Sequence, residues 1–213
     1  MYSSIFITGF RATGKTTIGR EVAQRLGWRF FDSDVFISER AGMTVAELTA
    51  QGTDWKLFRQ MEVDFLKEIA TQQNVVLAMG GGACVNDVVH EASGKTFGEI
   101  GKEIVSQINN AFVVLLTASE TVVSDRIREE ESRVGGAGTV RPMLDSNLAQ
   151  QIQGMDASQI TNEVILHSLK IWRERQSLYA QLTDNVLDTS KFSVEECTEK
   201  ILEWLQGGNK FSL

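Results

Sequence analysis

The stretch FITGFRATGKTT, residues 6–17, places two glycines, a lysine and two threonines directly after a run of β-branched and aromatic residues. Gly9, Gly14, Lys15 and Thr16 fit the phosphate-loop pattern G-x-x-x-x-G-K-[ST]. Glycine lets main-chain N–H groups approach phosphate oxygens, and the following helix adds the positive end of its dipole. The pattern predicts a nucleotide-binding loop rather than a glycine-rich turn that contains a lysine by chance. In such a loop the lysine can bridge β- and γ-phosphates, and the threonine hydroxyl can ligate Mg²⁺.

Outward from this loop, strand-like and helix-like segments alternate along all 213 residues. We expect strands over residues 2–8, 28–34, 74–79, 111–119 and 185–190. We expect helices over residues 16–27, 35–42, 44–52, 54–73, 120–131, 162–182 and 193–208. This alternation predicts an α/β fold: a single domain over residues 1–213, with a parallel sheet and helices on both faces. Two polar, glycine-bearing segments, 86–110 and 129–160, are expected to leave the sheet, the first with a helix over 95–109.

The composition excludes several function classes. Lys and Arg number 21 against 28 Asp and Glu, and the resulting net charge of −7 argues against general nucleic-acid or acidic-membrane binding. Two cysteines, Cys84 and Cys197, do not make a disulfide framework and suggest reduced thiols. The chain shows no signal peptide and no apolar run long enough to span a bilayer. We therefore expect a cytoplasmic protein, and we expect it to be a monomer.

Two of the expected strand ends carry candidate site residues. Asp32 and Asp34 lie two apart at the end of the 28–34 strand, where alternation would aim both side chains to one side. Gly80, Gly81 and Gly82 follow the 74–79 strand, where a ligand could press on the main chain. Because ligands bind at the carboxyl ends of parallel strands, we expect both groups near the phosphate loop. Taken alone, the acids could be a helix cap and a solvated carboxylate, and the glycines a flexible turn.

Three arginines are further candidates. Arg59 lies on the 54–73 helix, Arg141 precedes the only proline, and Arg175 lies on the 162–182 helix. An arginine on a helix is commonly just part of a solvated face. These arginines are good candidates for ligand binding only if the fold brings them close to the phosphate loop, the paired acids and the glycines.

Taken in order, six motifs in this chain resemble those of the shikimate kinase family over nearly its whole length. They are GFRATGKTTIG, FFDSD, LFRQME, LAMGGGA, VRPML and RQSLY. The resemblance implies an ATP-dependent, Mg²⁺-requiring kinase that phosphorylates shikimate to shikimate 3-phosphate in aromatic amino-acid biosynthesis. It also implies a five-stranded parallel sheet in the order 2-3-1-4-5, with an acceptor-binding region over about 33–73 and a lid over about 129–160.

The resemblance also implies a role for each matching residue. Lys15, Asp34 and Arg141 would be catalytic. The metal would be held by Thr16 directly and by Asp32 through water. The nucleotide would be bound by Gly9, Ala12, Thr13, Gly14, Lys15, Thr16, Thr17 and, over the adenine, Arg126. Shikimate would be bound by Asp34, Arg59, Gly80, Gly81, Gly82, Arg141 and Arg175.

Several positions depart from the family pattern. Ala12 stands where glycine is usual and is tolerated if its backbone torsions are ordinary. Arg11 stands where shorter residues are common, and Ser177 replaces a proline. The segments 86–110 and 142–174 are longer than expected and could alter the acceptor site. The alternatives are therefore a kinase of the same fold acting on gluconate or a nucleotide, or a binding module without turnover.

Overall fold

The computed structural model describes residues 2–50, 55–133, 154–183 and 185–207. Its main sheet has five strands in the order β2-β3-β1-β6-β7, and every neighbouring pair is parallel. Their bounds are Arg29–Asp32 (β2), Val75–Ala78 (β3), Ser4–Thr8 (β1), Ala111–Thr117 (β6) and Val186–Asp188 (β7). Counted along the chain within this sheet, the order is the 2-3-1-4-5 expected from the sequence, which confirms the predicted fold.

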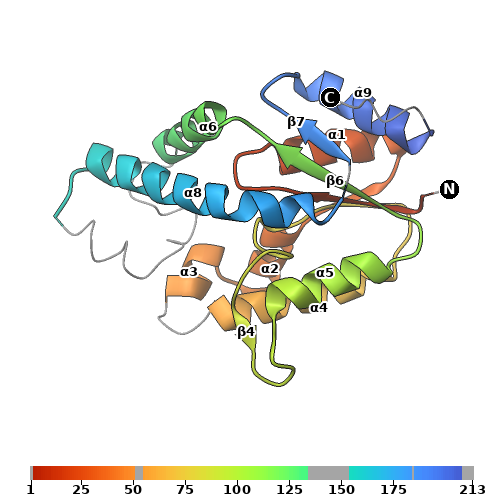
Figure 1. The fold of residues 1–213 in the computed structure, drawn as a ribbon, viewed down its shortest axis with the longest axis horizontal. Helices are drawn as coiled ribbons and strands as arrows, with labels where there is room; N and C mark the ends of the chain where they lie inside the picture. The colour runs from red at the N-terminus through yellow and green to blue at the C-terminus, as the bar shows by residue number, and fades with distance from the viewer. Residues whose placement is uncertain (1, 51–54, 134–153, 184, 208–213) are drawn as a thin grey trace.

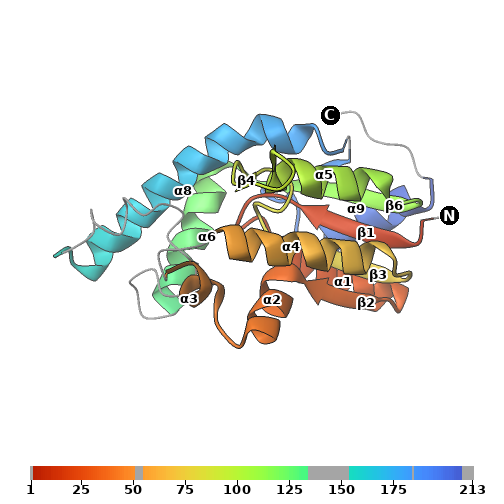
Figure 2. The same ribbon diagram turned by 90° about the horizontal axis from the view of Figure 1, so that it is seen from below.

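Helices cover both faces of this sheet (Figure 1). The helices are α1 (Lys15–Leu26), α2 (Ser33–Ala41), α3 (Val45–Ala50), α4 (Trp55–Ala70), α5 (Phe97–Gln107), α6 (Glu120–Arg133), α8 (Ala157–Ala180) and α9 (Val194–Leu205). Helices α1 and α9 pack together on one face, where their apolar side chains meet alternate residues of the central strands, such as Ile5 and Ile7. Helices α4 and α5 run side by side on the other face (Figure 2), and α6 and α8 join the same apolar cluster around Phe6.

The central strands are buried on both faces. All five residues of β1 and all four of β3 are buried, which explains why both read as continuous apolar runs rather than alternating ones. The phosphate loop follows β1, and the triple glycine follows β3, the neighbouring strand. Both therefore emerge at the same carboxyl edge of the sheet, where open α/β sheets bind ligands.

The segment 86–110 contains more than the expected helix. A two-stranded antiparallel hairpin, β4 (Val89–His90) and β5 (Lys95–Thr96), precedes α5, which begins with a capping box between Thr96 and Glu99. Among the described residues no helix is long and apolar enough to cross a membrane.

Candidate active site

The phosphate loop has the backbone of an anion cradle. Gly9 and Gly14 have φ values of 140° and 92°, and a Cβ on Gly9 would come 2.2 Å from the carbonyl oxygen of Leu116. Only glycine fits at Gly9. Helix α1 begins at Lys15 without a side-chain cap, which leaves its first N–H groups available to a ligand. The Lys15 ammonium lies over this loop and donates a hydrogen bond to the carbonyl of Phe10 at 2.7 Å.

Ala12 differs from expectation. Its φ is 62°, in the left-handed region, so its torsions are not ordinary for alanine. Its carbonyl accepts a hydrogen bond from Nη1 of Arg126 at 3.0 Å. The same guanidinium donates to the hydroxyl and the carbonyl of Thr189, at 3.0 and 3.1 Å. These contacts hold the loop in this conformation from the side of α6.

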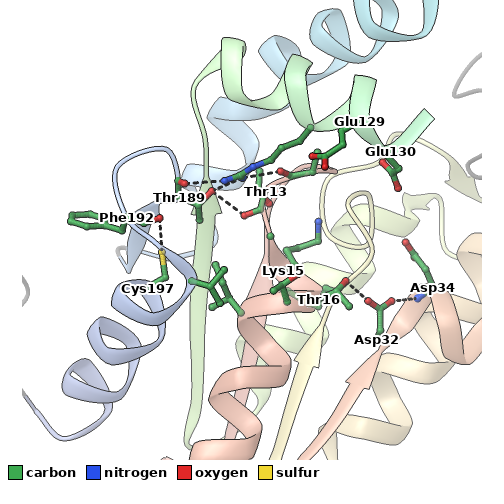
Figure 3. Close-up of a pocket in the computed structure, with 17 residues that line it drawn as sticks. Thr13, Lys15, Thr16, Asp32, Asp34, Glu129, Glu130, Thr189, Phe192 and Cys197 are labelled. Carbon is green, nitrogen blue, oxygen red and sulfur yellow. Dashed lines mark hydrogen bonds between the residues drawn. The ribbon is translucent and has the colours of Figure 1, made fainter. Parts of the chain in front are cut away.

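Asp32 and Asp34 do not both belong to a strand, so the predicted strand alternation does not apply to them, although both line the same cavity. Strand β2 ends at Asp32, and Asp34 lies in the first turn of α2. Oδ1 of Asp32 caps this helix by accepting from the main-chain N–H groups of Asp34 and Val35. Oδ2 of Asp32 accepts the Thr16 hydroxyl at 2.6 Å. The helix-cap reading of the acid pair was therefore right for Asp32, and its second oxygen is also joined to the phosphate loop (Figure 3).

Around the phosphate loop lies a cavity of about 430 Å³. Figure 3 shows Lys15, Thr16 and Thr13 along one wall, with Glu129 and Glu130 across from them. The predicted site residues that line it are Ala12, Thr13, Gly14, Lys15, Thr16, Thr17, Asp32, Asp34 and Arg126. Seven residues contiguous in the sequence, 12–18, therefore supply most of the loop side of this cavity, and Arg126 joins them from α6.

A second cavity, of about 380 Å³, adjoins the first. The predicted site residues that line it are Asp34, Arg59, Gly81, Gly82 and Arg175. Apolar residues, among them Val45, Trp55 and Phe58, line the same space. Asp34 and Glu130 line both cavities, so these two carboxylates stand where one cavity meets the other. The fold thus brings Arg59 and Arg175, 116 residues apart in the sequence, to a single pocket next to the phosphate loop.

Arg59 is buried beneath the triple glycine. Its guanidinium forms an ion pair with Glu62, three residues along α4, and lies over the rings of Trp55 and Phe58 with Cζ 4.8 and 5.2 Å from their centroids. A Cβ on Gly82 would come 2.5 Å from this guanidinium. The absence of a side chain at Gly82 therefore allows the main chain to lie directly against Arg59.

Glu62 completes this arrangement, although no role was predicted for it from the sequence. Burial raises the pKa of Glu62 and the nearby Asp34 carboxylate adds to the rise, whereas Arg59 and Arg175 oppose it. A Cβ on Gly80 would come 2.2 Å from Oε1 of Glu62, so this glycine makes room for the carboxylate. The LFRQME motif contained a signal for this contact: Arg59 and Glu62 are three residues apart, and such residues are neighbours on a helix.

Gly81 and Arg175 are joined by a tyrosine. The Tyr179 hydroxyl donates a hydrogen bond to the carbonyl of Gly81, and it also interacts with Arg175, one turn earlier on α8. Burial raises the pKa of Tyr179, so the phenol stays protonated and remains a donor. Helix α8 is thereby fixed to the glycine turn at the level of Arg175.

The donor set at the foot of the loop suits Mg²⁺. Thr16 and Asp32 offer a hydroxyl and a carboxylate oxygen, and a small hard cation that keeps several waters needs few protein ligands beyond substrate phosphates. Within the described residues, His, Cys, Asp and Glu form no group of three that could hold a metal by themselves. Arg141, the remaining predicted site residue, lies outside the described residues.

Comparisons with known proteins agree with this geometry. The family model described as shikimate kinase matches residues 11–206. The shikimate kinase of Syntrophus aciditrophicus is 30% identical over 203 residues, covering 95% of this chain and 91% of that protein. Shikimate kinase 2 of Yersinia pseudotuberculosis is 30% identical over 213 residues, covering 97% and 98%. Among solved structures, the shikimate kinase of Acinetobacter baumannii in complex with shikimate has a TM-score of 0.73 at 23% identity, covering 100% of this chain and 97% of that one. The enzyme of Bacteroides thetaiotaomicron has a TM-score of 0.69 at 25% identity, covering 96% and 98%.

Proposed function

The chain belongs to the shikimate kinase family of phosphotransferases, and we propose that it transfers the terminal phosphoryl group of ATP to a ring hydroxyl of shikimate. The observation that carries this proposal is the pair of adjoining cavities that share Asp34. One is built on a phosphate loop and the other on two arginines. A donor triphosphate and a small anionic acceptor would therefore meet at this carboxylate.

In the first cavity, the main-chain N–H groups of the loop and the start of α1 would hold the ATP phosphates. Lys15 would leave the Phe10 carbonyl to neutralise charge on the transferring group. Arg126 lines the same cavity and would lie over the adenine. The fit of Thr16 and Asp32 to Mg²⁺ supports their assignment as its protein ligands, and the ion, when bound, supplies positive charge to the phosphates.

In the second cavity, Arg59 and Arg175 would bind the carboxylate of shikimate. A planar guanidinium offers two parallel N–H donors, which match the two oxygens of a carboxylate. Nε of Arg59 is buried and has no hydrogen-bond partner among the described residues, which favours a ligand that supplies one. Val45 and Phe58 would pack against the ring carbons.

The transfer itself needs positioning more than covalent help. Asp34 would accept the proton of the attacking hydroxyl while that oxygen forms a bond to the γ-phosphorus. The bond between this phosphorus and the oxygen that bridges it to the β-phosphate breaks, and ADP leaves with that oxygen. Arg141 would add positive charge from a lid over about 129–160, and closure would exclude water.

The remaining assignments complete the proposal. We place the chain as one domain, acting as a monomer in the cytoplasm, and two buried free cysteines accord with a reducing compartment. The apolar wall beside the two arginines favours an acid with a partly apolar carbon ring over gluconate, a linear polyhydroxy acid, or a nucleoside monophosphate as acceptor. Lys15 and Asp34 are both present in the expected cavities, which favours turnover over a silent binding module.

An acceptor panel tests the proposal. ADP release would be coupled to a spectrophotometric assay with shikimate, quinate, gluconate and AMP, each with and without Mg²⁺. We expect turnover with shikimate that requires Mg²⁺. Turnover of gluconate or AMP without turnover of shikimate would refute the acceptor assignment, and tight shikimate binding without ADP release would refute the enzymatic one.

A further inference from the structure

Helix α6 holds the phosphate loop at two successive residues. Arg126 donates to the carbonyl of Ala12 at 3.0 Å. One turn later, Glu130 and Glu131 face Arg11, whose Nη2 lies 3.1 and 3.4 Å from their carboxylate oxygens. The two contacts meet the loop on either side of the peptide bond between Arg11 and Ala12. This part of the loop is thus fixed by side chains from a helix more than 110 residues away in the sequence.

The contact with Arg11 is largely buried. The side chain of Arg11 is 8% exposed, that of Glu131 is 2% exposed and that of Glu130 is 27% exposed. Ion pairs removed from solvent are screened far less than surface pairs, and they depend strongly on geometry. Such a pair restricts where the main chain at Arg11 can lie, which an exposed pair would not do.

The residue that this contact restrains is unfavourable in its observed conformation. Ala12 has a φ of 62°, and a residue with a Cβ occupies this region about tenfold less readily than glycine does. A loop with alanine here tends to relax towards negative φ, which would turn the adjoining main-chain N–H groups away from the phosphates. An external restraint is needed to keep it in place.

We propose that Arg11 is a positioning residue for nucleotide binding: its ion pairs with Glu130 and Glu131 hold Ala12 in the left-handed conformation that the phosphate loop requires. This inference rests on the proposed function, because it assumes that the loop binds nucleotide phosphates. It assigns a role to the departure at Arg11 and the departure at Ala12 together.

The test is a double-mutant cycle read by calorimetric titration with MgADP, which needs no acceptor and no turnover. The variants are Arg11→Gln, Ala12→Gly and the combination of both, with Arg128→Gln as the control. Arg128 is an exposed arginine on α6, and its side chain forms an ion pair with Asp125. Urea unfolding of each variant measures global stability separately.

We expect Arg11→Gln to weaken MgADP binding about tenfold, since the relaxed loop then competes with the bound one. Ala12→Gly alone is the reference for the double variant, and it should bind MgADP no more weakly than wild type, because glycine adopts the left-handed conformation without strain. In the Arg11→Gln background the glycine should recover most of the lost affinity, to within about threefold of wild type. Arg128→Gln should leave the Kd unchanged.

Three results would overturn the inference. The first is a normal Kd for Arg11→Gln together with a lower urea midpoint. The second is a double variant that binds MgADP no better than Arg11→Gln, and the third is an equal loss of MgADP affinity in the Arg128→Gln control. If Arg11→Gln does not fold, Glu131→Gln, which keeps the shape of the side chain, replaces it in the double-mutant cycle with Ala12→Gly. Failure of the wild-type protein to bind MgADP would instead refute the proposed function.

Discussion

The two cavities of this protein are built in different ways. The proposed nucleotide cavity, the one around the phosphate loop, uses main-chain groups of one short segment, and its shape depends on backbone torsions at Gly9, Ala12 and Gly14. The proposed acceptor cavity, the one lined by Arg59 and Arg175, uses charged side chains from α2, α4 and α8 against the main chain of a glycine turn. Recognition by the main chain requires a local sequence, whereas recognition by buried side chains requires a tertiary arrangement. Mutations should therefore separate the two cavities in binding experiments.

The largest effect is expected at the nucleotide cavity. Lys15→Ala removes the ammonium over the loop, and we expect kcat to fall by at least about a hundredfold, because charge stabilisation at the transferring group is lost. The urea midpoint should change little, since Lys15 is not part of an apolar cluster. Lys67→Ala, an exposed lysine on α4, is the matched control. A normal rate would remove Lys15 from the transfer step.

The next effect is expected where the cavities meet. Asp34→Asn should lower kcat by about a hundredfold and also weaken shikimate binding, because the amide cannot accept the hydroxyl proton. The binding of MgADP should be nearly unchanged, which steady-state kinetics and calorimetry together would reveal. Asp64→Asn, an exposed acid on α4, controls for loss of charge. Unchanged kinetics would show that the carboxylate shared by both cavities does not act on the acceptor.

A selective effect is expected at the acceptor cavity. Arg59→Lys replaces a planar fork with a point charge, and we expect the KM for shikimate to rise by about tenfold or more while the KM for ATP stays unchanged. The control is Arg40→Lys, an exposed arginine on α2 that pairs with Glu68. An equal rise in both KM values would mean that Arg59 supports the fold as a whole and not the acceptor.

The smallest effect compares two neighbouring glycines. A Cβ at Gly82 would come 2.5 Å from Arg59, whereas a Cβ at Gly81 would meet nothing closer than 3.6 Å. Gly82→Ala should lower the free energy of unfolding by about 1–3 kcal/mol, because the guanidinium must shift, and Gly81→Ala by less than about 0.5 kcal/mol. Urea unfolding measures both. Equal losses would contradict the close packing of the main chain on Arg59.

Local patterns in the sequence predicted the phosphate loop and the parallel α/β fold, whereas the strand order was implied by the family resemblance. The sequence also indicated Arg59, Arg175 and the triple glycine as site residues, through motifs whose order matched a family. It did not predict that Asp34 lies in the first turn of a helix, although a helix cap was one of the readings left open for the acid pair. Nor did it predict the contacts of Arg11 with α6, which join residues about 120 positions apart.

The two hydrogen-bonding roles of Asp32 limit how the shape of the acceptor pocket could change during evolution. One of its oxygens holds the Thr16 hydroxyl and the other holds the start of α2, so a single carboxyl group sets the spacing between the phosphate loop and Asp34. Evolution towards a larger or smaller acceptor cannot easily move that wall without disturbing the donor side. The apolar residues of the same pocket, Val45, Trp55 and Phe58, belong to a separate cluster from the phosphate loop, so changes there can leave the donor side in place.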